Sequence, residues 1–282
     1  MIKPCSIRDW FDKLTINQWI RQDHHKSILN SRGLSLTLIS CCLLVFSFLV
    51  SCGNKEDIII EGTLENGAGK VIFIEDITPE TRMFQDSLTL DSKGHFKFRT
   101  QMPYKTFYNI HVSDEDYIVV LPDKGETITI SGNYDSLSRT YHLQAGNESQ
   151  LLWQLQDYTN DGNRQLRELV ATDNYNREAL AAGKITQKEF DKLHAQSDSV
   201  YLQIFSQQQQ YVVNFIQNNL GSLTTLIALY KPFNNRPLIN PEDSFEFYPA
   251  VLEGLEETMP DNPHTIYFRN EVERLRFYYE GR

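Results

Sequence analysis

The sequence predicts an α+β protein, in which an N-terminal antiparallel β-sandwich of about eight strands is followed by an all-helical segment. Between residues 58 and 146, short apolar or alternating runs recur about every ten residues, separated by turn residues, which is typical of a two-sheet sandwich. Beyond residue 146 the apolar residues take helical spacing. The first 51 residues differ from both parts, because they hold three of the four cysteines and one long uncharged run.

The uncharged run indicates a targeting segment, which has to be excluded from the fold. It covers Leu34–Val50, seventeen residues without a charge, and Lys26 and Arg32 precede it. It ends in Leu-Val-Ser-Cys at residues 49–52, the pattern called a lipobox, in which the Cys thiol is acylated and the chain is cut just before it. The alternative is a membrane span, for which this length is borderline across a hydrocarbon core ~30 Å thick. The lipobox favours a lipoprotein signal peptide, with Cys52 as the lipidation site.

The predicted signal peptide determines which cysteines the mature chain would keep. Cys5, Cys41 and Cys42 would leave with the signal peptide, and Cys52 would carry lipid. The mature chain would then have no free thiol. It could form no disulfide, hold no thiolate metal site and perform no thiol–disulfide exchange by itself.

The charge balance narrows the choice of partners. Residues 52–282 carry 21 basic and 34 acidic side chains, which argues against a nucleic-acid partner and against adhesion to anionic lipid. We expect membrane contact through the lipid anchor, in the cell envelope of a Gram-negative bacterium, at the outer membrane facing the periplasm. Lys55-Glu56-Asp57 resembles an export signal of surface lipoproteins, so surface exposure stays open.

The chain therefore divides into four predicted parts. These are an N-terminal extension and signal peptide (1–51), an acylated Cys and tether (52–57), a β-sandwich domain (58–146) and a helical connector domain (147–282). The tether reaches only about 20 Å, at ~3.4 Å per residue, which would hold the sandwich close to the lipid headgroups.

Eight runs make up the predicted strands of the sandwich. They are Ile58–Leu64, Lys70–Glu75, Phe84–Leu90, His95–Thr100, Phe107–Ser113, Tyr117–Leu121, Thr127–Ser131 and Thr140–Leu143. The clearest pair flanks a tight turn at Asp91–Gly94, in which Gly supplies positive φ. Alternation on both sides predicts antiparallel strands with one buried face. The residues expected inside are Phe96, Phe98, Ile110, Val112, Ile128 and Ile130.

Helical spacing predicts two helices over Glu148–Tyr158 and from Asn163 to about Ala182, the second closed by Gly. A capping box at Thr186–Glu189 opens a third, long helix that continues to Leu220. Gln207–Gln210 lies inside this third helix, and we expect it to face solvent. Shorter helices are expected from Ser222 to Tyr230, after Asn240-Pro241, after Tyr248-Pro249 and after Asn262-Pro263.

The loops and histidines predict no metal or phosphate site. Residues 67–70 (Gly-Ala-Gly-Lys) lack the spacing of a phosphate loop and indicate a hairpin turn. Asp114–Asp116 lacks the alternating ligands and Gly of a calcium loop, so we expect a solvated turn. The five histidines after the signal show neither HxH nor HExxH spacing; they are His95, His111, His142, His194 and His264.

The sequence also predicts no catalytic or cofactor-binding residue. It contains no GxSxG nucleophile elbow, and no cysteine is left to pair with a histidine. Some aromatic residues could line a pocket, although core packing is their commoner use; they are Tyr104, Phe107, Tyr108, Tyr278 and Tyr279. We therefore expect no enzyme activity.

Several short motifs occur in a fixed order behind the lipobox. They are Ile60-x-Gly62, Asp86-Ser87, Gly94-x-Phe96-x-Phe98, Gly125-x-x-Ile128-x-Ile130-x-Gly132 and Leu143-x-Ala145-Gly146-Asn147-Glu148-Ser149. In this order they resemble the N-terminal β domain (domain of unknown function 4369) of the thiol–disulfide interchange lipoproteins. A helical connector follows that domain in the family, and residues 215–222 and 259–263 resemble it. The resemblance covers about residues 58–279.

The family implies a further, thioredoxin-like domain with a Trp-Cys-x-x-Cys motif, which would begin about where this sequence ends, so no redox residue maps onto it. Two functions stay open. The first is a membrane-anchored envelope lipoprotein, a non-catalytic binding or scaffolding module for an envelope protein. The second is a truncated or split component of a thiol–disulfide interchange system, which would work with a thioredoxin-like partner.

Overall fold

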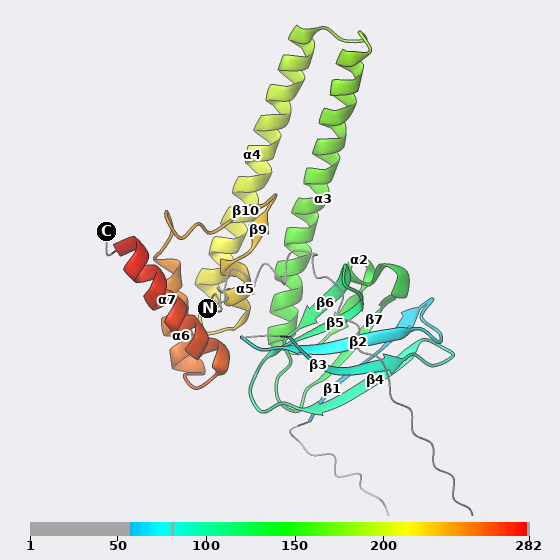
Figure 1. Cartoon of the computed structure of the whole chain (residues 1–282), viewed down its shortest axis with the longest axis vertical. Helices are drawn as coiled ribbons and strands as arrows, with labels where there is room; N and C mark the ends of the chain where they lie inside the picture. The colour runs from blue at the N-terminus through cyan, green and yellow to red at the C-terminus, as the bar shows by residue number, and fades with distance from the viewer. Residues whose placement is uncertain (1–56, 80–81, 281–282) are drawn as a thin grey trace, which may run out of the picture.

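The computed structural model describes residues 57–79 and 82–280, and its architecture is α+β, with sheets first and helices after them (Figure 1). The predicted signal peptide, the lipidation site Cys52 and the tether up to residue 56 lie outside the described residues. Those predictions therefore stay predictions.

The described residues before Asn147 form eight strands in two four-stranded sheets, with orders β4-β1-β7-β8 and β3-β2-β5-β6. The strands are β1 (Asp57–Glu65), β2 (Val71–Ile77), β3 (Arg82–Thr89), β4 (His95–Gln101), β5 (Phe107–Ser113), β6 (Asp116–Val120), β7 (Thr127–Asn133) and β8 (His142–Gln144). A 3₁₀ turn, η1 (Tyr134–Ser136), and the short α2 (Leu137–Thr140) connect β7 to β8.

The first sheet is mixed, which corrects the prediction of an antiparallel sandwich. β1 pairs antiparallel with β4 but parallel with β7, so that Ile60 lies opposite both Phe98 and Ile128. Alternation determines which face of a strand is buried, but it carries no information about the direction of the neighbouring strand. The chain reaches β7 only after it has crossed to the second sheet and returned, and it then runs in the same direction as β1.

The tight turn at Asp91–Gly94 joins the two sheets instead of closing a hairpin within one, because β3 pairs with β2 and β4 pairs with β1. Gly94 has a φ of 79°, and a Cβ at this position would lie 2.2 Å from the carbonyl oxygen of Leu64. Only Gly meets both conditions. The turn thereby carries the chain across the edge of the core.

The two sheets share one apolar core. Five of the six residues expected inside are buried, and Val112 is partly buried against the same cluster. Burying one such side chain contributes about 1.5–3 kcal/mol. The rest of the cluster comes from both sheets and α2, and its buried members include Ile58, Ile60, Leu64, Ile72, Ile74, Leu90, Tyr108, Ile118, Val120 and Leu137.

Two long helices, α3 (Asn147–Ala181) and α4 (Gln187–Asn218), form a hairpin that projects from the sheets (Figure 1). α3 is continuous, which corrects the prediction of two separate helices. At 1.5 Å per residue it is about 50 Å long. The capping box of Thr186 and Glu189 is confirmed at the start of α4, and Gly183, with a φ of 68°, follows the end of α3.

A close contact between Gly162 and Gln208 holds the two long helices together. A Cβ on Gly162 would lie 2.4 Å from the side chain of Gln208, and Gln208 is only 3% exposed. The expectation that Gln207–Gln210 faces solvent is therefore wrong for Gln208. The missing side chain of a glycine in α3 makes room for this glutamine.

The last part of the chain contains two short strands, so the predicted all-helical segment is wrong in this respect. Its elements are α5 (Thr224–Leu229), β9 (Pro232–Phe233), β10 (Arg236–Pro237), α6 (Phe247–Thr258) and α7 (Pro263–Glu280). These two strands come in addition to the eight strands of the two larger sheets, so that the described residues hold ten strands in all. The segment after Pro241 forms turns where a helix was expected.

The helices share a second core with the second sheet. Ile77, Phe107 and Leu121, from β2, β5 and the end of β6, are buried in one cluster with Leu155 of α3 and Phe268 of α7. The sheets and the helices therefore pack as one body, and the base of the hairpin is held against the sheets.

Candidate functional site

The loops singled out in the sequence lie apart from one another. Gly67–Lys70 is a turn, but it links β1 and β2 of different sheets, so the predicted hairpin is wrong. Asp114 and Glu115 are exposed between β5 and β6, as expected. Asp116 is instead half-buried, and its carboxylate accepts the backbone N–H groups of Leu137 and Ser138 at 2.8 and 2.7 Å, which holds the start of α2.

The histidines are also separated. His95 and His142 are exposed, His194 contacts Asp173 across the long hairpin at 2.8 Å, and His111 is half-buried on β5 with its Nε2 atom 3.6 Å from Glu75. In the part of the chain that the structure describes, no three or more His, Cys, Asp or Glu residues are grouped to hold a metal ion.

Most of the aromatic residues named above pack in cores, although Tyr278 is exposed. Phe107 is buried in the second core and Tyr108 in the first, and Tyr279 packs against the second. Burial raises the pKa of Tyr108 above its ordinary range.

The fifth histidine, His264, is buried where α7 meets the sheets. Its Nε2 atom lies 2.9 Å from the Thr106 hydroxyl, which itself donates to the carbonyl oxygen of Ile77 at 2.7 Å. The Thr106 oxygen therefore accepts from His264, whose imidazole carries its proton on Nε2. Burial lowers the pKa of His264 to about 3, so the ring is neutral at physiological pH.

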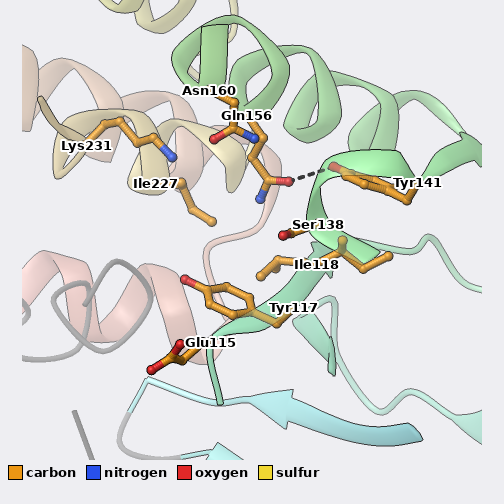
Figure 2. Close-up of a pocket in the computed structure, with 10 residues that line it drawn as sticks. Glu115, Tyr117, Ile118, Ser138, Tyr141, Gln156, Asn160, Ile227 and Lys231 are labelled. Atoms are coloured by element: carbon orange, nitrogen blue, oxygen red, sulfur yellow. Dashed lines mark hydrogen bonds between the residues drawn. The ribbon is translucent and has the colours of Figure 1, made fainter. Parts of the chain in front are cut away.

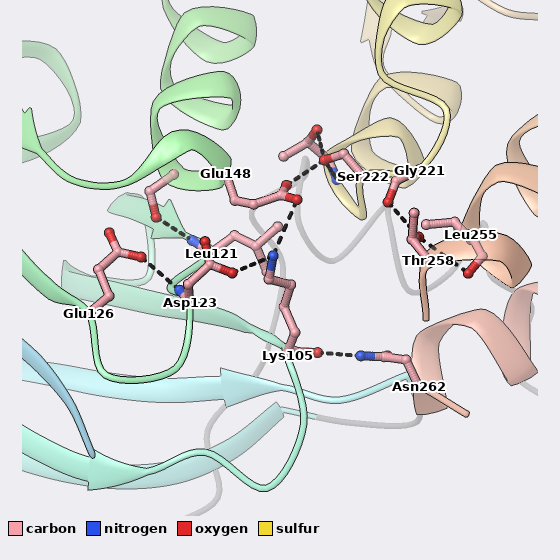
Figure 3. A network of polar contacts seen from close by, with 12 residues as sticks. Lys105, Leu121, Asp123, Glu126, Glu148, Gly221, Ser222, Leu255, Thr258 and Asn262 are labelled. Carbon is pink, nitrogen blue, oxygen red and sulfur yellow. Dashed lines mark hydrogen bonds and ion pairs between the residues drawn. The ribbon is translucent and has the colours of Figure 1, made fainter. Parts of the chain in front are cut away.

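A polar network beside this histidine joins the sheets to three helical elements (Figure 3). The Lys105 ammonium lies 2.6 Å from Asp123 and 3.2 Å from Glu148 at the start of α3. Glu148 in turn accepts a hydrogen bond from the Ser222 hydroxyl, just before α5. The carbonyl oxygen of Lys105 accepts from the Asn262 side chain at 2.9 Å, at the start of α7.

Two further contacts fix the base of α3. The Ser149 hydroxyl accepts the backbone N–H of Leu121 at 2.9 Å, and the Glu126 carboxylate accepts the N–H groups of Gly146 and Asp123. Glu148 and Ser149, which the sequence showed only as the end of a motif, are thus the residues that attach the long hairpin to the sheets.

A small cavity lies between the sheets and the helices (Figure 2). Its volume is about 200 Å³. One side is formed by β6 and α2, and the other by α3 and the end of α5. Its lining comprises Glu115, Tyr117, Ile118, Val119, Ser138, Tyr141, Gln156, Asn160, Ile227 and Lys231.

Lys231 is the one cation in the lining of this cavity. Figure 2 shows Lys231, Ile227 and Gln156 extending toward Tyr117 and Ile118 from the opposite side. The Lys231 side chain is half-buried and makes no ion pair or hydrogen bond with any described residue. Desolvation lowers the pKa of its ammonium to about 8, since burial disfavours the charged form.

Comparison of the chain with protein-family models, with curated proteins and with solved structures gives no match. Within the described residues, no helix is both long and apolar enough to cross a membrane.

The sequence offered one signal for Lys231 that was not used. Residues 222–239 are almost free of charge, and Lys231 stands inside this apolar stretch, directly after α5 and before Pro232. A single lysine in a buried segment needs either a partner or a cavity. Lys105 had no comparable signal, because its partners lie 18 and 43 residues away along the chain.

Proposed function

We propose that this chain is a membrane-anchored envelope lipoprotein, held by lipid on Cys52, which acts as a non-catalytic binding or scaffolding module. The observation that supports it best is the long α3–α4 hairpin, whose base is packed and hydrogen-bonded to the sheets while its far part projects away from them (Figure 1). Such a rigid arm can hold a partner at a fixed distance from the membrane.

The two helices of the hairpin carry apolar side chains that the described part of the molecule does not cover. Tyr175 is 67% exposed and Leu202 is 59% exposed, and Val170 and Val200 are exposed as well. Large exposed apolar side chains on an element that projects from the body offer a partner apolar surface to contact. They support a docking role for the arm, with an envelope protein as partner.

The alternative is a truncated or split component of a thiol–disulfide interchange system, in which a two-sheet sandwich and a connector precede a thioredoxin-like partner. It rests on the resemblance of the short motifs. Residues 53–282 contain no cysteine, and disulfide exchange requires a thiolate that attacks sulfur. We therefore propose that the chain performs no exchange by itself, and turnover of insulin disulfides above the dithiothreitol background would contradict this.

The anchor is tested by metabolic labelling with an alkyne fatty acid. We expect label on the wild-type protein and none on Cys52→Ser, which should also leave the membrane fraction. Cys42→Ser is the matched control and should keep its label, because that cysteine lies inside the predicted signal. Unchanged labelling of Cys52→Ser would contradict the proposal.

The docking role is tested in the same cells with a photo-crosslinking amino acid. Placed at Tyr175 or Leu202, it should yield discrete adducts with an envelope protein. Placed at Lys97, which is exposed on β4, it should not. If no adducts formed from Tyr175 or Leu202, or if Lys97 gave adducts of equal yield, the arm would not be the binding surface.

A further inference from the structure

The cavity between the sheets and the helices has a charge that nothing in the described residues balances. Glu115, at the exposed rim, is the only carboxylate in the lining, and it forms no ion pair with Lys231. A half-buried ammonium without a partner is costly, because it loses hydration and gains no hydrogen bond. An anionic group placed in the cavity would restore that partner.

The position of Lys231 is fixed by the backbone on both sides. Its N–H donates to the Ala228 carbonyl at 3.2 Å, and its own carbonyl accepts the Leu238 N–H at 3.1 Å. Pro232 follows directly and ends the helix. The side chain therefore leaves from a rigid point beside Ile227, which lines the same cavity.

The walls of the cavity are mixed, and their arrangement suits a molecule with one charged end. Ile118, Val119 and Ile227 give an apolar surface next to the Tyr117 ring. Gln156 and Asn160 contribute amides from α3, and the Gln156 oxygen already accepts the Tyr141 hydroxyl at 3.0 Å. An apolar body with a single anionic group thus matches the lining better than a highly charged ligand.

The volume limits the size of the ligand. A cavity of 150 Å³ accommodates benzene, so that one of about 200 Å³ takes roughly eight or nine non-hydrogen atoms. This is the size of a small aromatic or branched carboxylate. A peptide or a nucleotide would extend beyond the cavity.

We propose that this cavity binds a small carboxylate with an apolar body, whose carboxylate pairs with Lys231 and whose body lies against Ile118, Val119 and Ile227. The inference deepens the proposed binding function and rests on it, but the cavity is distinct from the exposed arm of the hairpin. Failure of ligand binding would leave the crosslinks from Tyr175 unaffected, so the two outcomes are distinguishable.

Benzoate and benzamide form a matched pair of probes, because they have the same number of non-hydrogen atoms and differ in charge. Isothermal titration of the detergent-solubilised full-length protein should show benzoate binding at least about tenfold more tightly than benzamide, as charge-assisted pairing predicts. Acetate, which lacks the apolar body, should bind more weakly than benzoate. Empty micelles give the background.

Two lysine variants test whether the preference for benzoate depends on Lys231. Lys231→Met keeps the aliphatic stem and should remove the preference for benzoate, whereas Lys184→Met, in the exposed turn between α3 and α4, should leave it unchanged. Saturation transfer from the Ile227 methyl groups to the benzoate ring should locate the ligand in the wild-type protein without any variant. Equal affinity for benzoate and benzamide, no benzoate binding, unchanged preference in Lys231→Met or absent transfer would each overturn the proposal.

Discussion

The imidazole Nε2 atom of His264 lies 2.9 Å from the hydroxyl oxygen of Thr106, although 158 residues separate them in the chain. Thr106 precedes β5, and His264 lies in the first turn of α7. The backbone N–H of His264 donates to the Asn262 side chain at 2.9 Å. One buried ring therefore ties the C-terminal helix to the second sheet. Burial lowers the pKa of this ring to about 3, so the neutral imidazole makes the contact at physiological pH.

Because the His264 ring is buried, we expect the free energy of unfolding to decrease in mild acid. The folded pKa of His264 is about 3 and the unfolded value is near 6.5, so between these pH values the unfolded chain binds the extra proton. The free energy of unfolding is therefore highest above pH 6.5 and decreases as the pH falls. At pH 5 it is lower by about 2 kcal/mol. Urea unfolding of wild type and His264→Gln at pH 7.5 and pH 5 measures it. Equal losses in both proteins would contradict the assignment.

The pairing of Lys105 with Asp123 and Glu148 predicts that replacing this lysine by an uncharged side chain of similar length lowers the stability of the protein. Lys105→Met should lower the free energy of unfolding by about 1–3 kcal/mol, because Glu148 is left largely buried without its cation. The matched control is Lys97→Met, which removes an exposed pair with Glu61 and should cost under about 1 kcal/mol. Chemical denaturation measures the free energy of unfolding of both variants. Equal losses in the two would disprove the role of Lys105.

A glycine in β1 should resist even the smallest substitution. A Cβ on Gly62 would lie 2.0 Å from the carbonyl oxygen of Ile130, a backbone atom in the paired strand β7. We expect Gly62→Ala to lose at least ~3 kcal/mol of stability, because the β1–β7 pair must separate to relieve the clash. Gly69→Ala has open space and a positive φ, and it should cost only about 1 kcal/mol. Comparable melting temperatures for the two variants would argue against the parallel β1–β7 register.

The sequence was informative where a local pattern decides the structure. Alternation located the strands between residues 58 and 146, since inward residues such as Phe96 and Phe98 must avoid water. The capping box at Thr186 located a helix start for an equally local reason. Neither pattern contains the direction of a partner strand, which is why the parallel β1–β7 pair was not predicted.

The junction and the cavity depend on contacts that are distant in the chain. Gln208 was expected in solvent because its neighbours are polar, yet Gly162 in α3 leaves a space that only the folded hairpin creates. Lys105, His264 and Lys231 acquire their roles in the same way. Such residues become apparent only when the helices lie against the sheets.

The proposed scaffolding role depends on the hairpin and the sheets moving as one body. Since residues 53–282 lack cysteine, Thr89→Cys on β3 and Arg167→Cys on α3 place two spin labels at exposed positions of this part of the chain without further changes. Pulsed electron–electron double resonance then measures the distance between them. The account predicts one narrow distance distribution, because the shared core and the Lys105 network fix the base of the hairpin. A broad or two-peaked distribution would show that the arm swings freely, and would contradict the proposal that it holds a partner at a fixed place.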